Sequence, residues 1–388
     1  TLNPQPSTLN SQPSTLNPPV DIILRNFFRL LRAGIFGEEQ TIEPMSPWKW
    51  HRAYQVAQTH EVAPLLSDGI DRCQSQFFMQ LPDALREHWL TTTAEVARQN
   101  QLATTRLGQL LAIYTQQQLR PIVLGSQSIA ALYDNPLRRP TPSIDIFLPF
   151  DTQGRKADQW AQANGTPRAV SERHAYAFLW QDVSVTHHHR LARLTNALHN
   201  RTLNTICEQE IRESPPSRMM LAGRQAEVLS PTLSMLLVLV SMAQTLLRNG
   251  ISVKQLADLA IMLRKQGDKT DFVKLQEWTD RLHMARMAQL CGELLVALMG
   301  LDADEIPFMP GTARTNIDEV LRDIASQQPT AASDWYFQQA GDIFVHTANS
   351  SAMMRQLRHS ARYSRYYPSE SITNFFASLA HSLSHIEE

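Results

Sequence analysis

Two adjacent residues, Gly125 and Ser126, have types and a setting that suit chemistry. They follow a short apolar run, Pro121 to Leu124, and precede a segment of helical composition. A glycine at a strand-to-helix turn lets backbone amides approach a phosphate, and the positive end of the helix dipole favours the anion. The pair predicts a phosphate-binding turn, and an ordinary turn is the alternative.

A single carboxylate, Asp145, stands in the next apolar run, between Ile144 and Leu148. A buried carboxylate is costly unless charged or hydrogen-bonding partners meet it. Mg²⁺ prefers one or two carboxylates together with phosphate oxygens. Asp145 is therefore either a metal ligand or one partner of a salt bridge with Arg138 or Arg139.

Three consecutive histidines end a later apolar stretch. In a strand, alternation places His187 and His189 on one face and His188 on the other. A transition-metal site with His174 and Asp145 is one interpretation. The alternative is a solvated run with one member packed in the core.

Basic and aromatic residues also alternate near the C-terminus. This pattern favours a solvated basic face on a terminal helix, and a phosphate or single-strand contact surface is the alternative. The residues are Arg355, Arg358, Arg362 and Arg365, with Tyr363, Tyr366 and Tyr367.

Short strands and helices alternate around these residues and predict a small mixed sheet. Residues 181 and 182 read as the turn of a hairpin. The expected strands are Arg120–Leu124, Ile144–Leu148, Ala175–Leu179 and Val183–His187, and the expected helices are Gly125–Tyr133 and Asp158–Asn164.

Apolar residues at helical spacing flank this segment on both sides, with Pro47, Pro64 and Pro82 as helix boundaries. Helices are expected from Ser230 to Gly250, over 253–263, 273–298 and 316–324, and over 375–383. The expected organisation is a disordered repeat tail (1–20), an N-terminal helical region (21–115), an α/β core (116–215), a helical domain (216–310) and a C-terminal helical extension (311–388).

Composition narrows the class of protein. A net charge of −1 gives no overall attraction to nucleic acid or anionic membranes. Three widely spaced cysteines form no disulfide framework or zinc motif, which favours the cytoplasm. The run from Leu233 to Met242 is too short to span a bilayer and predicts a buried core helix. We expect neither a membrane span nor a signal peptide.

Taken in order, these segments resemble an uncharacterised nucleotidyltransferase family, common in bacteria, of the DNA polymerase β-like superfamily. The resemblance runs from about Pro47 to about Leu301. It is carried by PWKWHRAYQVAQTHEVAPLL (Pro47–Leu66), by Gly125–Asp145, by Val185–Leu191, by Leu229–Leu263 and by the late YYPSE (Tyr366–Glu370).

The resemblance implies a D-x-D pair and a third acid on a later strand, which hold two divalent ions against a nucleoside triphosphate. These positions carry Ser143, Asp145 and Thr186, and Leu124 replaces a usual lysine. The positions that match the family pattern are Gly125, Tyr133, Arg139, Asp145, His188 and Asp258. Gly125, Ser126 and Arg139 would bind the nucleotide, and Asp145 the metal.

The fold class expected is α+β, a small mixed-sheet nucleotidyltransferase core flanked by N-terminal and C-terminal helical regions. Two neutral hydroxyls in place of carboxylates predict weak or absent Mg²⁺ binding and impaired or inactive NMP transfer to an unknown acceptor. Two alternatives remain. One is an active enzyme in which Asp182 or Asp258 supplies a carboxylate, and the other is a non-catalytic nucleotide-binding or protein-interaction module.

Overall fold

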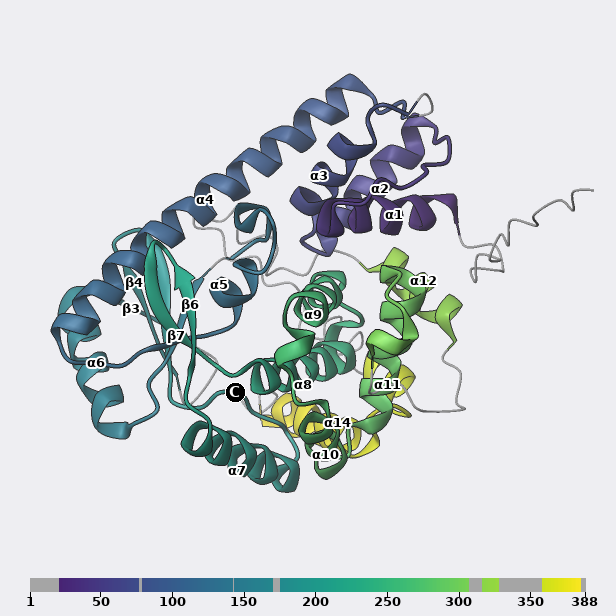
Figure 1. Ribbon diagram of the computed structural model, residues 1–388. Coiled ribbons are helices and arrows are strands. Elements are labelled where there is room, and N and C mark those ends of the chain that lie inside the picture. The colour runs from purple at the N-terminus through teal and green to yellow at the C-terminus, as the bar shows by residue number, and fades with distance from the viewer. Residues whose placement is uncertain are drawn as a thin grey trace, which may run out of the picture.

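One long helix connects the N-terminal helices to the sheet. The computed structural model describes residues 21–76, 79–141, 143–169, 175–306, 316–327 and 358–384, with side chains as far as 376 in the last range. Helix α4 (Asp83–Gln116) runs from the N-terminal helices to the sheet (Figure 1). At 1.5 Å per residue, its 34 residues span about 51 Å. The repeat tail lies outside the described residues.

A seven-stranded mixed sheet forms the centre of the α/β region, as the sequence predicts in kind. In spatial order the strands are β3 (Thr166–Arg168), β4 (Ala175–Trp180), β5 (Val183–His188), β2 (Ser143–Phe147), β1 (Ile122–Val123), β7 (Arg224–Val228) and β6 (Ser217–Leu221). Strand β2 pairs parallel with β5 and antiparallel with β1, and β1 pairs parallel with β7.

The β4–β5 hairpin is confirmed, with Gln181 at a positive φ of 56° in its turn. Three other strands were not predicted. Strand β3 extends this hairpin antiparallel, and the β6–β7 hairpin adds to the far side of β1. The second hairpin lies within residues assigned to a helical domain, so the sheet includes chain from both sides of α7 (Ala197–Glu213).

Helices cover the two faces of the sheet unequally. On one face, α4 and α6 (Asp151–Asn164) enclose a compact core in which Leu107 and Ala157 meet Ile144 and Val185. On the other face, apolar residues such as Phe147 join a larger core shared with the downstream helices. Strand β2 therefore separates two cores, and its alternate side chains face one or the other.

The N-terminal helices begin where the prolines predict. Pro47 and Pro64 lie in the first turns of α2 (Pro47–Thr59) and α3 (Ala63–Cys73), and Pro82 is the N-cap of α4. Proline is tolerated there because the first turn lacks acceptors for its missing N–H. Helix α1 (Ile22–Phe36) packs against α3.

The downstream helices largely follow the predicted pattern. Ser230 caps α8 (Pro231–Asn249) through its hydroxyl, and Gly250 ends that helix. Helix α9 (Val253–Gln266) follows. The single helix expected over 273–298 is instead two, α10 (Phe272–Arg281) and α11 (Ala285–Leu294), and the second continues as a π-helical turn, Leu295–Met299.

Helix α8 is long and apolar enough to cross a membrane by length and composition alone, but 56% of its most apolar window is buried inside the fold. Leu236, Leu239 and Val240 have no exposed surface. The prediction that Leu233 to Met242 forms part of a buried core helix is confirmed.

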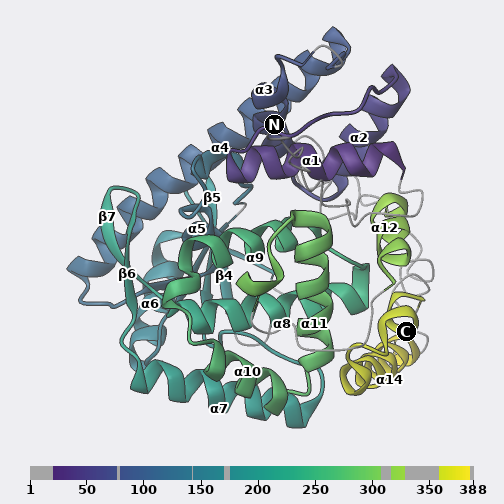
Figure 2. The same ribbon diagram turned by 45° about the vertical axis from the view of Figure 1, so that its right-hand side comes forward.

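Two C-terminal helices lie beside α11 (Figure 2): α12 (Ile317–Ser326) and α14 (Pro368–Ser384). Glu370 of α14 is fully buried, and its carboxylate accepts the backbone N–H groups of Thr195 and Asn196 before α7. These bonds attach the C-terminal helix to the loop that follows β5.

Among the described C-terminal residues, the alternative of a basic and aromatic contact surface is not found, whereas Arg358 and Arg365 are exposed. Arg355 lies outside the described residues. Tyr363 and Tyr367 are buried, and Arg362 and Tyr363 both bind the carboxylate of Asp323 on α12. Because these aromatic rings are packed in the core, nucleic-acid bases cannot stack on them.

Candidate functional site

The pairing of β2 with β5 brings the predicted acid positions together. Asp145 lies directly opposite Thr186, and Phe147 lies opposite His188. Because side chains alternate along each strand, Ser143 and Asp145 share one face of the sheet with Thr186 and His188. The three positions that the resemblance assigns to acids therefore lie close together on one face of the sheet.

Asp145 is held by its neighbours. Ser143 Oγ donates to Asp145 Oδ2 at 3.0 Å, and His188 Nε2 lies 3.0 Å from Oδ1. The side chains of Asp145 and His188 are 22% and 18% exposed, so both remain accessible. Each carboxylate oxygen already accepts one hydrogen bond within the protein, although further lone pairs remain.

A salt bridge from Asp145 to Arg138 or Arg139 is not found. Arg138 Nε instead lies 2.8 Å from Asp68 Oδ1, and Arg139 pairs with Asp258. Both arginines precede β2 and are directed away from its carboxylate to other elements.

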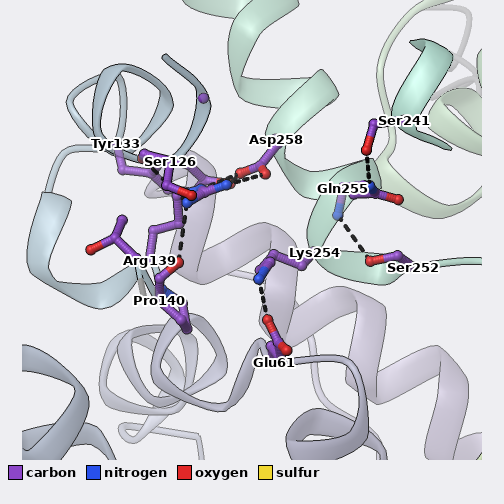
Figure 3. Close-up of polar contacts among 12 residues, drawn as sticks. Glu61, Ser126, Tyr133, Arg139, Pro140, Ser241, Ser252, Lys254, Gln255 and Asp258 are labelled. Carbon is purple, nitrogen blue, oxygen red and sulfur yellow. Dashed lines mark hydrogen bonds and ion pairs between the residues drawn. The ribbon is translucent and has the colours of Figure 1, made fainter. Parts of the chain in front are cut away.

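Arg139, Asp258 and Tyr133 form a buried cluster (Figure 3). Arg139 Nε and Nη2 each donate to one oxygen of Asp258 at 2.7 Å, and the Tyr133 hydroxyl donates to Oδ1 at 2.9 Å. The Arg139 and Asp258 side chains are 5% and 4% exposed. Burial, and then the Asp258 charge, raise the pKa of Tyr133 well above its usual value.

The same arginine fixes the Gly125–Ser126 turn. Arg139 Nη1 donates to the backbone oxygen of Ser126 at 3.2 Å and to that of Pro140 at 3.1 Å. The guanidinium thus fastens the start of α5 (Gly125–Ala130) to α9. Its nucleotide-binding role stays a prediction, because four of its five N–H donors already serve protein acceptors.

Gly125 has a backbone conformation that suits glycine. Its φ is +42°, and a side chain built there would meet nothing within 4 Å. The position is constrained by the backbone and faces open space. An exposed, close-approach turn of this kind is what the phosphate-binding prediction requires, and Ser126 follows it at the rim of a cleft.

A cleft of about 350 Å³ brings these groups together, a size within the usual range of small-molecule sites. Its walls come from the sheet, α5, α8 and α9. The charged and polar residues that line it are Ser126, Ser128, Arg139, Asp145, His188, Ser234, Ser241, Lys254, Gln255 and Asp258.

Sequence reasoning missed five polar residues of this cleft: Ser128, Ser234, Ser241, Lys254 and Gln255. Lys254, near the start of α9, forms an ion pair with Glu61 of the α2–α3 turn. Gln255 Nε2 donates to Ser241 Oγ of α8 at 2.8 Å (Figure 3). No local motif marks these residues, because each contact joins segments that are distant in sequence.

The three histidines diverge as alternation predicts. His187 lies on the opposite face of the sheet, where its Nδ1 is 2.8 Å from Asp158 Oδ1 and its Nε2 is 2.5 Å from the Tyr114 hydroxyl. His189 also contacts Asp158, at 3.0 Å. The sheet separates both from His188, so they cannot join Asp145 around one ion. His174 lies outside the described residues.

The residues present do not fit a pair of magnesium ions. Asp182 pairs with Arg106 at the hairpin turn and precedes Thr186 by four residues, about 13 Å along a strand. Both oxygens of Asp258 are bound by Arg139. Within the part of the chain that the structure describes, no three His, Cys, Asp or Glu residues are grouped to hold a metal ion. Neither Asp182 nor Asp258 completes the site.

A family model described as an uncharacterised nucleotidyltransferase matches residues 46–300. The chain belongs to this family. The matched range agrees with the resemblance found in the sequence, and it includes the whole sheet and every residue that lines the cleft. No curated protein and no solved structure matches the chain.

Proposed function

We propose that this nucleotidyltransferase-family protein is a DNA polymerase β-like member that has lost two-ion NMP transfer and keeps its cleft as a nucleoside triphosphate-binding site. The three free, buried cysteines support a cytoplasmic setting. The observation that carries the proposal is the paired face of β2 and β5, where the three acid positions hold one carboxylate.

The loss of two carboxylates changes the chemistry of this face. Two bound divalent ions bring four positive charges, and Asp145 alone offers one negative charge to receive them. Hydroxyls such as those of Ser143 and Thr186 are neutral and weak ligands for Mg²⁺. Removing a group that stabilises developing charge typically costs about 3 kcal/mol of transition-state stabilisation, so losing two amounts to several.

The binding part of the site is better preserved. The Gly125–Ser126 turn, the cleft volume and the polar rim from α8 and α9 are all in place, and the Arg139 cluster holds the turn against α9. These features support nucleotide binding that does not depend on Mg²⁺.

Restoring the acids tests the proposal. In the wild-type protein, calorimetric titration with ATP should give the same affinity with and without Mg²⁺. The double variant Ser143→Asp, Thr186→Asp should bind ATP more tightly, by about tenfold or more, only when Mg²⁺ is present.

The matched control is Ser143→Asn, Thr186→Asn, which adds similar volume without charge and should remain indifferent to Mg²⁺. Mg²⁺-dependent pyrophosphate release by the wild-type protein that disappears in Asp145→Asn would show that transfer has survived and would end the proposal.

A further inference from the structure

The charges that line the cleft are unequally neutralised. Of the described lining residues, Arg139 and Lys254 have basic side chains, and Asp145 and Asp258 have carboxylates. Arg139 and Asp258 neutralise each other inside the wall. Asp145 is engaged by Ser143 and His188. Lys254 is therefore the basic residue of the cleft whose ionic partner does not itself line the cleft.

That counter-charge is Glu61, in the turn between α2 and α3. Its side chain is 39% exposed, whereas that of Lys254 is 18% exposed. Figure 3 shows Lys254 extending from the start of α9 to Glu61. Because water screens the partly exposed Glu61 carboxylate, its attraction for the Lys254 ammonium is weak, and a more highly charged anion can replace it.

The turn fixes Glu61 in place. Its backbone has a positive φ of 57°, and its N–H donates to the oxygen of Gln58 at 3.0 Å. The preceding residue, His60, is buried, and its Nε2 lies 3.1 Å from the oxygen of Ile324 on α12. Lysine has a flexible four-carbon stem with a compact charge, so the Lys254 ammonium can reach a ligand in the cleft as well as Glu61.

We propose that Lys254 is the cation that binds a polyphosphate in the cleft, and that Glu61 competes with the polyphosphate for it. This inference rests on the proposed nucleotide-binding function and adds the regulation of that site. A triphosphate carries several negative charges and offers charge-assisted hydrogen bonds, so it displaces one screened carboxylate.

The competition links the cleft to the N-terminal helices. A ligand that takes Lys254 releases the α2–α3 turn from α9, and a partner that holds Glu61 away leaves Lys254 free for phosphate. Such coupling is reciprocal: the factor by which a partner at Glu61 changes phosphate affinity equals the factor by which phosphate changes the affinity for that partner. The N-terminal helices thereby tune how tightly the cleft holds its anion.

The test uses variants of the full chain in which one charged side chain, Glu61 or Lys254, is replaced by a neutral one. Sodium tripolyphosphate and ATP are titrated calorimetrically without Mg²⁺. Glu61→Gln should tighten both ligands by about fivefold, the scale of a partly exposed ion pair. Lys254→Met should weaken them by about tenfold, and Glu61→Gln should have no effect in the Lys254→Met background.

Glu38→Gln is the matched control. Glu38 pairs with Arg264 at 3.0 Å and also joins the N-terminal region to α9, but Arg264 does not line the cleft. Its loss should leave both affinities unchanged. A wild-type affinity in Glu61→Gln, or a gain that persists without Lys254, would overturn the inference.

A second measurement needs no variant. Saturating tripolyphosphate should accelerate hydrogen exchange in residues 58–63 of the wild-type protein, and unchanged exchange would refute the competition.

ATP affinity that is indifferent to Glu61→Gln overturns this inference and leaves the proposed function standing. Tripolyphosphate binding that depends on Glu61, without ATP binding in any variant, supports the inference and overturns the proposed function. Absence of binding by both ligands in every variant overturns both.

Discussion

The wall of the cleft holds two carboxylates with opposite surroundings. Asp258 is 4% exposed and bound in parallel by the two guanidinium nitrogens of Arg139, with the Tyr133 hydroxyl as a third donor. Asp145 is 22% exposed and meets one hydroxyl and one imidazole. The first carboxylate is committed to the structure, and the second still faces the space where a ligand would bind.

This difference separates the shape of the site from its chemistry. The Arg139 cluster holds the Gly125–Ser126 turn against α9, and neither element depends on metal-binding acids. The face of β2 and β5 is therefore well formed although it holds a single carboxylate, Asp145. A family fold with a well-formed cleft is consequently no guarantee of the family reaction.

The largest effect is expected at Asp258. Asp258→Ala leaves the buried Arg139 guanidinium without its counter-charge, and removing one partner of a buried ion pair costs about 3–5 kcal/mol. Urea unfolding, monitored by circular dichroism, should show a correspondingly lower free energy of unfolding.

Asp182→Ala is the natural control, because Asp182 pairs with Arg106 at a solvent-exposed hairpin turn. Its loss should leave stability close to that of the wild-type protein. An equal loss of unfolding free energy in the two variants would mean that the buried Arg139–Asp258 pair does not stabilise the fold more than the exposed Arg106–Asp182 pair.

A buried histidine of β5, His187, extends the comparison to pH. Burial lowers the pKa of His187, against an opposing effect of Asp158. The unfolded chain therefore binds more protons than the folded chain just below the ordinary histidine pKa, about 6.5. The free energy of unfolding should fall as the pH drops from 7 toward 5, by at most about 1.4 kcal/mol per unit for this group.

Chemical denaturation at a series of pH values measures this slope, and His187→Gln should flatten it. His60 has a pKa lowered by burial as well, so part of the slope should persist in the variant. An identical slope in both proteins would show that His187 is not buried in its neutral form.

The smallest effect is expected at Asp145. Asp145→Asn keeps the size of the side chain and removes a charge that water already screens in part. We expect the free energy of unfolding to change by less than about 1 kcal/mol. A loss as large as that of Asp258→Ala, in the same unfolding assay, would erase the contrast between the two carboxylates.

The sequence predicts those parts of the fold in which local signals are strong. Prolines and caps such as Pro47 and Ser230 mark helix starts because each acts on its own turn. The β6–β7 hairpin was missed because Arg218, Met219 and Met220 do not alternate clearly in polarity, and its turn uses Ala222 at a positive φ of 52°. Tertiary pairing, not local propensity, makes this segment a strand.

The candidate site shows the same limit. Asp145, Ser143 and Thr186 could be placed together from their strand positions and the family pattern. The partners of Arg139 and Lys254 could not, because Asp258 and Glu61 lie 119 and 193 residues away. Contacts at such separations are fixed by how helices pack, and a single sequence carries no periodic signal for them.

Glu370 has a practical consequence for anyone who shortens this chain. The family match ends at residue 300, yet the carboxylate of Glu370 accepts two N–H groups at the start of α7, inside the matched range. A fragment trimmed to the match would expose those donors and the apolar surfaces now beneath α1 and the C-terminal helices. The recognisable nucleotidyltransferase segment is therefore shorter than the unit that can be expected to remain soluble and crystallise.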